Sequence, residues 1–175
     1  MAVSQPQPAS VPMRQVVAAL LAQRGVSIPA LAQVVLDLQR PYAPDLTLAE
    51  CEDSLWHVLD KREVQNALLT GLALDMLAER DMLPEPLGSM IRRDDPLYGI
   101  DEILPLSIVN VYGTIGLTNF GYLDKVKPGP IGGTDRRAGQ VNTFLDDLIS
   151  ALVAAAAARI AHRRGPASSG PGAQP

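Results

Sequence analysis

Residues 143–163, TFLDDLISALVAAAAARIAHR, decide how this chain folds. Either Asn142 or Thr143 can cap the N-terminus of a helix in this stretch. The alanines at positions 151 and 154–158 allow other helices to approach it closely. We therefore expect a helix that continues to about residue 163 and packs tightly against its neighbours. Basic residues at its end favour the negative end of the helix dipole: Arg159, His162, Arg163 and Arg164.

Upstream of this stretch, capping and breaking residues predict a series of shorter helices. Residues 13–23 form the first, which Gly25 can end. Ser27 followed by Pro29 opens the second, and Pro41 stops it. Each boundary is set by local chemistry, so we expect two separate helices before residue 42.

Thr47 and Glu50 form a capping box, the clearest helix start in the chain. From residue 48 to about residue 82, apolar residues recur at threes and fours without a proline. This pattern predicts one helix, or two that abut near Lys61. A short helix follows at residues 87–92.

The next helix is expected to start near Asp101, because Pro105 fits only the first turn, where its missing N–H is not needed. It is expected to run on toward Leu117. Residues 127–139 are rich in glycine and proline and predict a long loop. The sequence contains no sustained alternation of the kind that predicts a strand, and it contains no internal repeat.

These elements predict an all-α protein, a single-domain compact multi-helix bundle over residues 13–164. Low-complexity Pro/Gly/Ser/Ala tracts at residues 1–12 and 165–175 are expected to be disordered. With 15 basic and 19 acidic residues the net charge is −4, so we expect no nucleic-acid partner. The N-terminus does not resemble a secretory signal, which favours a cytoplasmic location. The longest apolar stretch, residues 103–117, is shorter than the roughly 20 residues of a bilayer span, so no transmembrane segment is expected.

Two acidic pairs precede nearly uncharged stretches, Asp101 with Glu102 and Asp146 with Asp147. Carboxylates buried side by side repel unless a cation lies between them. Mg²⁺ prefers oxygen ligands and usually takes one or two carboxylates together with water and phosphate oxygens. These four residues are therefore candidate metal ligands.

Asp124 and Lys127, just before a Pro-Gly turn, add a cation that can hold a phosphate as a point charge. Each feature also has a simpler interpretation. An acidic pair can serve only to cap a helix, and a loop lysine can simply be solvated. The Gly-Thr-Ile-Gly run at residues 113–116 favours a close helix crossing over a phosphate loop.

Taken in order, these pieces resemble the phosphatidylglycerophosphatase A family, in particular a short soluble branch. The resemblance spans about residues 61–163, with further similarity over residues 43–51. Four ordered segments carry it: 61–67 (KREVQNA), 98–104 (YGIDEIL), 121–129 (GYLDKVKPG) and 143–147 (TFLDD). The chain departs from the membrane-embedded members in lacking their spanning helices and N-terminal Gly/Pro/Thr/Ser-rich motif, and Ile100 replaces their tryptophan.

The resemblance implies magnesium-dependent removal of the terminal phosphate of phosphatidylglycerophosphate. The metal would be held by Asp101, Glu102, Asp146 and Asp147. Lys127 would stabilise phosphate charge, and Asp124 would orient Lys127 or complete the metal shell. A phospholipid headgroup substrate implies peripheral contact with a membrane.

Two other functions remain open from the sequence. The enzyme could act on a soluble phosphate ester or a nucleotide, or the chain could be a non-catalytic helical oligomer that binds a cation. Residues 16–21 and 34–38 offer more apolar surface than a small helical core uses. We therefore expect a homo-oligomer, with a twofold dimer as the default.

Overall fold

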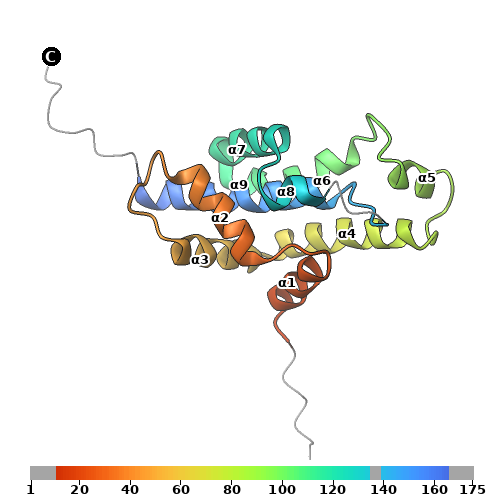
Figure 1. The fold of residues 1–175 in the computed structure, drawn as a ribbon, viewed down its shortest axis with the longest axis horizontal. Coiled ribbons are helices and arrows are strands. Elements are labelled where there is room, and N and C mark those ends of the chain that lie inside the picture. Colours follow the sequence, from red (N-terminus) through yellow and green to blue (C-terminus); the bar gives the residue numbers. More distant parts are fainter. Residues whose placement is uncertain (1–10, 135–138, 166–175) are drawn as a thin grey trace, which may run out of the picture.

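The computed structural model describes residues 11–134 and 139–165. These residues form α-helices and one 3₁₀ turn, arranged around one long helix near the C-terminus (Figure 1). The predicted tails, residues 1–12 and 165–175, lie almost entirely outside the described part of the chain. The elements are α1 (Met13–Gln23), α2 (Ile28–Gln39), α3 (Leu48–Leu59), α4 (Arg62–Glu79), α5 (Leu87–Arg92), α6 (Ile100–Val109), η1 (Asn110–Tyr112), α7 (Gly113–Val126), α8 (Pro130–Thr134) and α9 (Leu145–Arg164).

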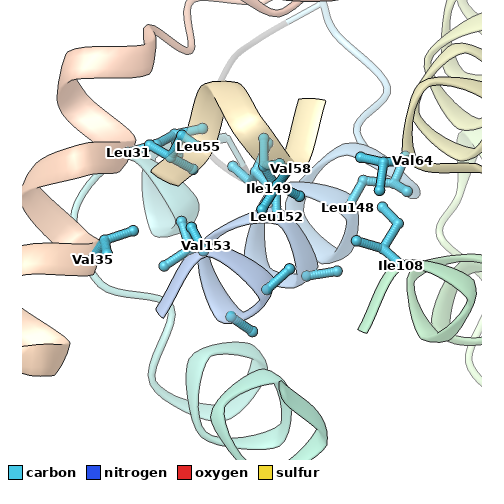
Figure 2. Packing of buried hydrophobic residues seen from close by; sticks show 14 of the residues in the cluster. Leu31, Val35, Leu55, Val58, Val64, Ile108, Leu148, Ile149, Leu152 and Val153 are labelled. Carbon is cyan, nitrogen blue, oxygen red and sulfur yellow. The ribbon is translucent and has the colours of Figure 1, made fainter. Parts of the chain in front are cut away.

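Helix α9 is the centre of the fold. Its residues from Leu145 to Ala158 are all buried, and α2, α3, α4, α6, α7 and α8 pack around it. Alanine occupies five consecutive positions from Ala154, so neighbours can approach its backbone on every side. Figure 2 shows Leu148, Ile149, Leu152 and Val153 of α9 within the apolar core. The all-α prediction is confirmed, and the predicted close packing on this helix is observed.

Close approach also depends on glycine. A Cβ atom at Gly71 of α4 would overlap the side chain of Leu148 in α9. A Cβ atom at Gly116 of α7 would lie 3.0 Å from the Val109 carbonyl oxygen and 3.1 Å from the Cβ of Tyr112. The close crossing predicted for residues 113–116 is therefore present at Gly116.

Several predicted boundaries are confirmed. Helix α1 spans residues 13–23, and the Ser27 hydroxyl caps α2 by accepting the Ala30 N–H. The Thr47–Glu50 capping box is complete, and the following helical stretch divides near Lys61 into α3 and α4. These boundaries depend on residues adjacent in sequence, which explains why they could be predicted.

The prediction of a helix from Asp101 toward Leu117 is wrong about where the helix ends and about the position of Pro105 in it. Helix α6 starts at Ile100 and stops at Val109, and Pro105 lies in its second turn rather than its first. Gly113 has φ +67° and ψ −160°, outside the helical range, and therefore interrupts the helical backbone after η1. Helix α7 then continues to Val126. By length and composition, the whole stretch Ile100–Val126 is apolar enough to cross a bilayer, a test that the core helix of a soluble protein also passes.

The predicted loop at residues 127–139 contains the five-residue helix α8, and residues 135–138 lie outside the described part. The apolar surface expected at residues 16–21 and 34–38 is largely used by the core. Val17, Leu21 and Val35 are fully buried, and Val34 is nearly so. Val16 is 36% exposed, and Leu20, Leu36 and Leu38 are half-buried, so these segments keep only part of the apolar surface that the sequence indicated.

Candidate functional site

The first turn of α9 carries the acidic pair Asp146 and Asp147. Both residues are buried, with exposed fractions of 7% and 6%. Carboxylates in the first turn of a helix favour the positive end of its dipole. Their burial goes further than a cap requires, because surface acids perform that role at no desolvation cost.

The C-terminal end of α7 brings Asp124 and Lys127 to this turn. Lys127 adopts a left-handed conformation with φ +45°, which ends α7. Its Nζ lies 2.5 Å from Oδ2 of Asp146. Asp124 lies close enough to Asp147 to raise the pKa of its carboxyl. The structure thus gathers four of the six predicted site residues into one cluster, which we call the α7–α9 acidic cluster: Asp124, Lys127, Asp146 and Asp147.

Burial raises the pKa of Asp147 to about 9, with further contributions from the charge of Asp146 and from Asp124. The nearby Lys127 acts in the opposite direction without cancelling this effect. At neutral pH the Asp147 carboxyl therefore holds a proton, and its O–H can donate to the Asp124 carboxylate. A divalent cation can replace such a proton, because it compensates the same negative charge.

A buried carboxylate on α4 caps α9 from a distance. Asp75 accepts the Phe144 N–H at 3.2 and 3.3 Å and the Leu145 N–H at 3.1 Å. Asp75 is fully buried, and burial raises its pKa to about 8 against the opposing hydrogen bonds and the charge of Arg24. Asp75 therefore fixes the first turn of α9, which carries the acidic pair.

The expected local cap of α9 is wrong. Phe144 is the N-cap, and no side chain of its own segment accepts a helix N–H. Thr143 instead donates from Oγ1 to the Ile91 carbonyl at 2.6 Å. Asn142 uses its oxygen to accept from Arg24 and its nitrogen to donate to the Thr134 carbonyl. Both side chains are occupied in holding the segment before α9.

Arg24 links three parts of the chain near this helix end. Its side chain is buried and forms an ion pair with Glu79 of α4 at 2.5 Å. It also donates to the Val141 carbonyl at 2.5 Å, while Glu79 accepts the Val141 N–H at 2.7 Å. The segment that leads into α9 is therefore held on both its N–H and C=O sides.

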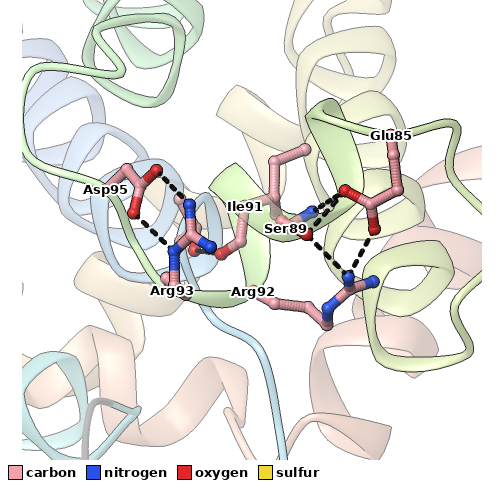
Figure 3. Close-up of polar contacts among 7 residues, drawn as sticks. Glu85, Ser89, Ile91, Arg92, Arg93 and Asp95 are labelled. Carbon is pink, nitrogen blue, oxygen red and sulfur yellow. Dashed lines mark hydrogen bonds and ion pairs between the residues drawn. The ribbon is translucent and has the colours of Figure 1, made fainter.

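Residues 85–95, which include α5, support the same region. Figure 3 shows Arg92 donating to Glu85 and Ser89, and Arg93 paired with Asp95. These contacts fold residues 85–95 into a compact turn. The Ile91 carbonyl that accepts from Thr143 belongs to this turn.

Asp101 lies near Tyr98, which contacts the residue before α9, whereas Glu102 is exposed to solvent. The ring of Tyr98 packs edge-on against Phe144, with 5.9 Å between ring centres. Burial and the charge of Asp101 raise the pKa of Tyr98, so Asp101 is close to this ring. Oδ1 of Asp101 is buried without a hydrogen-bond partner. Glu102 is exposed and has no hydrogen bond or ion pair with a described residue.

The donor chemistry fits a hard divalent cation. The cluster offers carboxylate oxygens, and Mg²⁺ commonly takes one or two such ligands beside water and phosphate oxygens. The unpartnered Oδ1 of Asp101 is a further oxygen donor in this region. Among the described residues, no group of three or more His, Cys, Asp or Glu side chains is close enough to hold a metal ion. The arrangement thus provides a carboxylate pair rather than an all-protein cage.

Sequence reasoning missed Asp75, Arg24 and Glu79. A signal for Asp75 was present, because it follows Leu68 by seven residues and Leu72 by three, which places it on the apolar face of its helix. A charged residue on a buried face needs a partner. Arg24 and Glu79 carry no comparable local signal.

Comparisons with known proteins identify the family of this chain. The sequence model of the family described as Phosphatidylglycerophosphatase A matches residues 17–162. The uncharacterized protein YpjQ of Bacillus subtilis is 58% identical over 143 residues, which cover 82% of this chain and 81% of that protein. The matched range includes residues 17–60, which lie before the residues 61–163 over which most of the resemblance was seen in the sequence.

Two solved structures share the fold. A protein of unknown function from Bacillus stearothermophilus is 52% identical, with a TM-score of 0.85 over 90% of this chain and 98% of that one. The low temperature requirement C protein of Listeria monocytogenes is 51% identical, with a TM-score of 0.84 over 88% and 98%. On the extent of the family match, the chain belongs to the phosphatidylglycerophosphatase A family.

Proposed function

We propose that this protein is a magnesium-dependent phosphatase that removes the terminal phosphate of phosphatidylglycerophosphate and leaves phosphatidylglycerol. The observation that carries the proposal is the buried Asp147 with the half-buried Asp124, beside the Lys127–Asp146 ion pair, in a chain of this family. A buried carboxylate of raised pKa beside a specific charge partner is typical of functional sites. Structural salt bridges do not require such burial.

Asp124 and Asp147 would hold the magnesium ion, with water and phosphate oxygens as its other ligands. Bound magnesium supplies a water of lowered pKa and neutralises charge on phosphate oxygens. Lys127, whose charge is balanced by Asp146, would bind a phosphate oxygen and stabilise the charge that develops during hydrolysis. Asp75 would keep the first turn of α9 in place, so that Asp146 and Asp147 stay oriented.

The substrate is the least constrained part of the proposal. A lipid substrate requires the protein to reach a membrane surface, and a net charge of −4 opposes contact with anionic lipid. The test must therefore compare the lipid with water-soluble phosphate esters.

The experiment measures phosphate release with and without Mg²⁺ from phosphatidylglycerophosphate in detergent micelles, from glycerol 3-phosphate and from a nucleotide. We expect Mg²⁺-dependent release from the lipid, and loss of that release in Asp147→Ala. Asp45→Ala is the matched control, because Asp45 is an exposed acid at the other end of α9.

Release from a soluble ester alone would replace the lipid with that ester class. Release from no substrate, with Mg²⁺ still raising the melting temperature, would instead select a non-catalytic cation-binding role.

A further inference from the structure

We propose that α6, η1 and α7 form the interface of a homodimer, in which the occupant of this surface is a second copy of the chain. The proposal does not depend on the proposed function. We call the surface the α6–α7 face and define it by its exposed apolar residues, chief among them Ile103, Val111, Ile115, Tyr122 and Val126.

Exposed apolar side chains concentrate on this face. Of the fourteen large hydrophobic residues that are exposed in the described part of the chain, eight lie within residues 97–126. In the most apolar window of Ile100–Val126, only 33% of the residues are buried. A concentration of exposed apolar side chains on neighbouring elements is typical of an interaction site.

The exposed residues of α7 follow the spacing of a helix-packing seam. Ile115, Thr118, Tyr122 and Val126 are separated by three, four and four residues, which places them along one side of the helix. All four are exposed, including Tyr122 at 54% and Val126 at 51%. Helix α7 packs on α9 (Figure 1), and its buried side chains Phe120 and Leu123 lie on a different side of the helix from this seam. One side of α7 therefore serves the core, and the other is available to a partner.

Charge decides between a second copy and a lipid surface. Residues 103–123 contain no Asp, Glu, Lys, Arg or His. Within Ile100–Val126 the only basic residue is Lys125. A helix that binds anionic lipid carries a polar face rich in Lys and Arg, and a net charge of −4 would oppose such binding.

The same pattern suits self-association. In a twofold interface the same patch occurs on both subunits, so any strongly charged patch would meet its own sign. An uncharged face avoids that repulsion, whereas the rest of this acidic chain does not. Exposed Thr114 and Thr118 add hydroxyls that a protein partner can hydrogen-bond.

The test is sedimentation equilibrium of the full chain over a wide concentration range. We expect the wild type to have twice the chain mass of 18.7 kDa. The double variant Ile115→Glu/Tyr122→Glu should sediment at 18.7 kDa with an unchanged helical circular dichroism spectrum. Burying unpaired glutamates should raise the dimer dissociation constant roughly a hundredfold or more.

Thr118→Arg is a second variant at an exposed position on the same seam, and we expect the same loss of dimer. Tyr42→Glu is the matched control, because Tyr42 is 76% exposed but lies outside the α6–α7 face, and it should remain dimeric. A monomeric wild type, a dimeric Ile115→Glu/Tyr122→Glu variant that is folded, or equal dissociation in Tyr42→Glu would each overturn the proposal.

Vesicles of phosphatidylglycerol and phosphatidylcholine test the alternative occupant by flotation. A wild type that is monomeric and floats with vesicles, while Ile115→Glu/Tyr122→Glu does not, would reassign the face to lipid.

Discussion

The two ends of α9 both pair charges with the helix dipole, yet they differ in solvent access. At the N-terminal end, Asp146 is 9% exposed in its side chain and contacts Lys127 at 2.5 Å. At the C-terminal end, Arg164 contacts Asp45 at 2.7 Å, and the Asp45 side chain is 79% exposed. The contact distances are similar. The surroundings are not.

This difference reverses the effect on the acids. The hydrogen bond from Arg164 lowers the pKa of Asp45, because the charged form stays solvated and gains a partner. Burial instead raises the pKa of Asp147 to about 9. Asp147 differs from the likewise buried Asp75, which accepts two backbone N–H groups, in facing Asp124 and Lys127, and this is why we place the site at the N-terminal end. A pocket at the C-terminal end, of about 420 Å³, is lined by residues of the exposed ion-pair network instead.

The substitution expected to have the largest effect at the N-terminal end of α9 is Asp147→Asn. The variant keeps the shape of the side chain but cannot become an anion, so it should lose magnesium binding. We expect phosphate release to fall by more than the ~10–100-fold that follows removal of a group supporting a metal ligand. Steady-state phosphate release at saturating Mg²⁺ measures this. Equal activity of Asp147→Asn and wild type would remove Asp147 from the site.

Asp75→Ala should have the next largest effect, on stability. The substitution leaves the buried N–H groups of Phe144 and Leu145 without their acceptor. We expect a loss of about 3 kcal/mol of unfolding free energy, because buried donors without partners are costly. Urea denaturation measures it. Asp75→Asn is the control, since its amide oxygen can still accept one N–H, and it should lose less. Equal losses in the two variants would contradict the capping role.

The cap by Asp75 also shows where sequence reasoning stops. Helix starts at Ser27 and Thr47 could be predicted, because the cap and the capped N–H are three residues apart. Asp75 and Phe144 are 69 residues apart, so their contact follows only from the packing of α4 on α9. Asn142 and Thr143 satisfied the local rule, yet tertiary contacts use their side chains for other partners.

The candidate site was predictable to a similar depth. Asp146 and Asp147 could be selected because an alanine-rich helix follows them, which indicates burial. Asp124 and Lys127 followed from the turn after α7. Asp101 and Glu102 could not be distinguished, because adjacent residues in a first helical turn differ in burial only through the neighbours they meet. The early end of α6 was missed because a glycine in a sequence does not reveal whether it adopts a positive φ, as Gly113 does.

A third prediction concerns how pH changes stability through the buried acids at the N-terminal end of α9. Asp75 and Asp147 have raised pKa values in the folded protein, about 8 and about 9, against the ordinary value of 3.8 for aspartate. Their contribution to stability is therefore present near pH 4 and is lost as the pH rises through 8 to 9. In EDTA, the melting temperature of wild type should fall from pH 6 to pH 9. Asp147→Asn should show a smaller fall.

Magnesium should oppose this loss, because it binds the ionised carboxylates of the native state. We expect about 10 mM Mg²⁺, a large excess over micromolar protein, to raise the melting temperature more at pH 8.5 than at pH 6. Differential scanning fluorimetry measures both shifts. A magnesium effect that is the same at both pH values, or that persists in Asp147→Asn, would contradict metal binding at the α7–α9 acidic cluster.

The smallest effect should come from Arg164→Ala at the exposed end. Arg164 bonds to Asp45 at 2.7 Å and to Glu50 at 3.2 Å, but water surrounds both acids and screens the attraction. We expect unchanged phosphate release and a slight fall in melting temperature. The difference from wild type should vanish in about 1 M NaCl, where the screening length falls to about 3 Å. A large loss of activity in Arg164→Ala would instead mean that the exposed ion pairs and their pocket belong to the site, and the contrast between the two ends of α9 would no longer identify it.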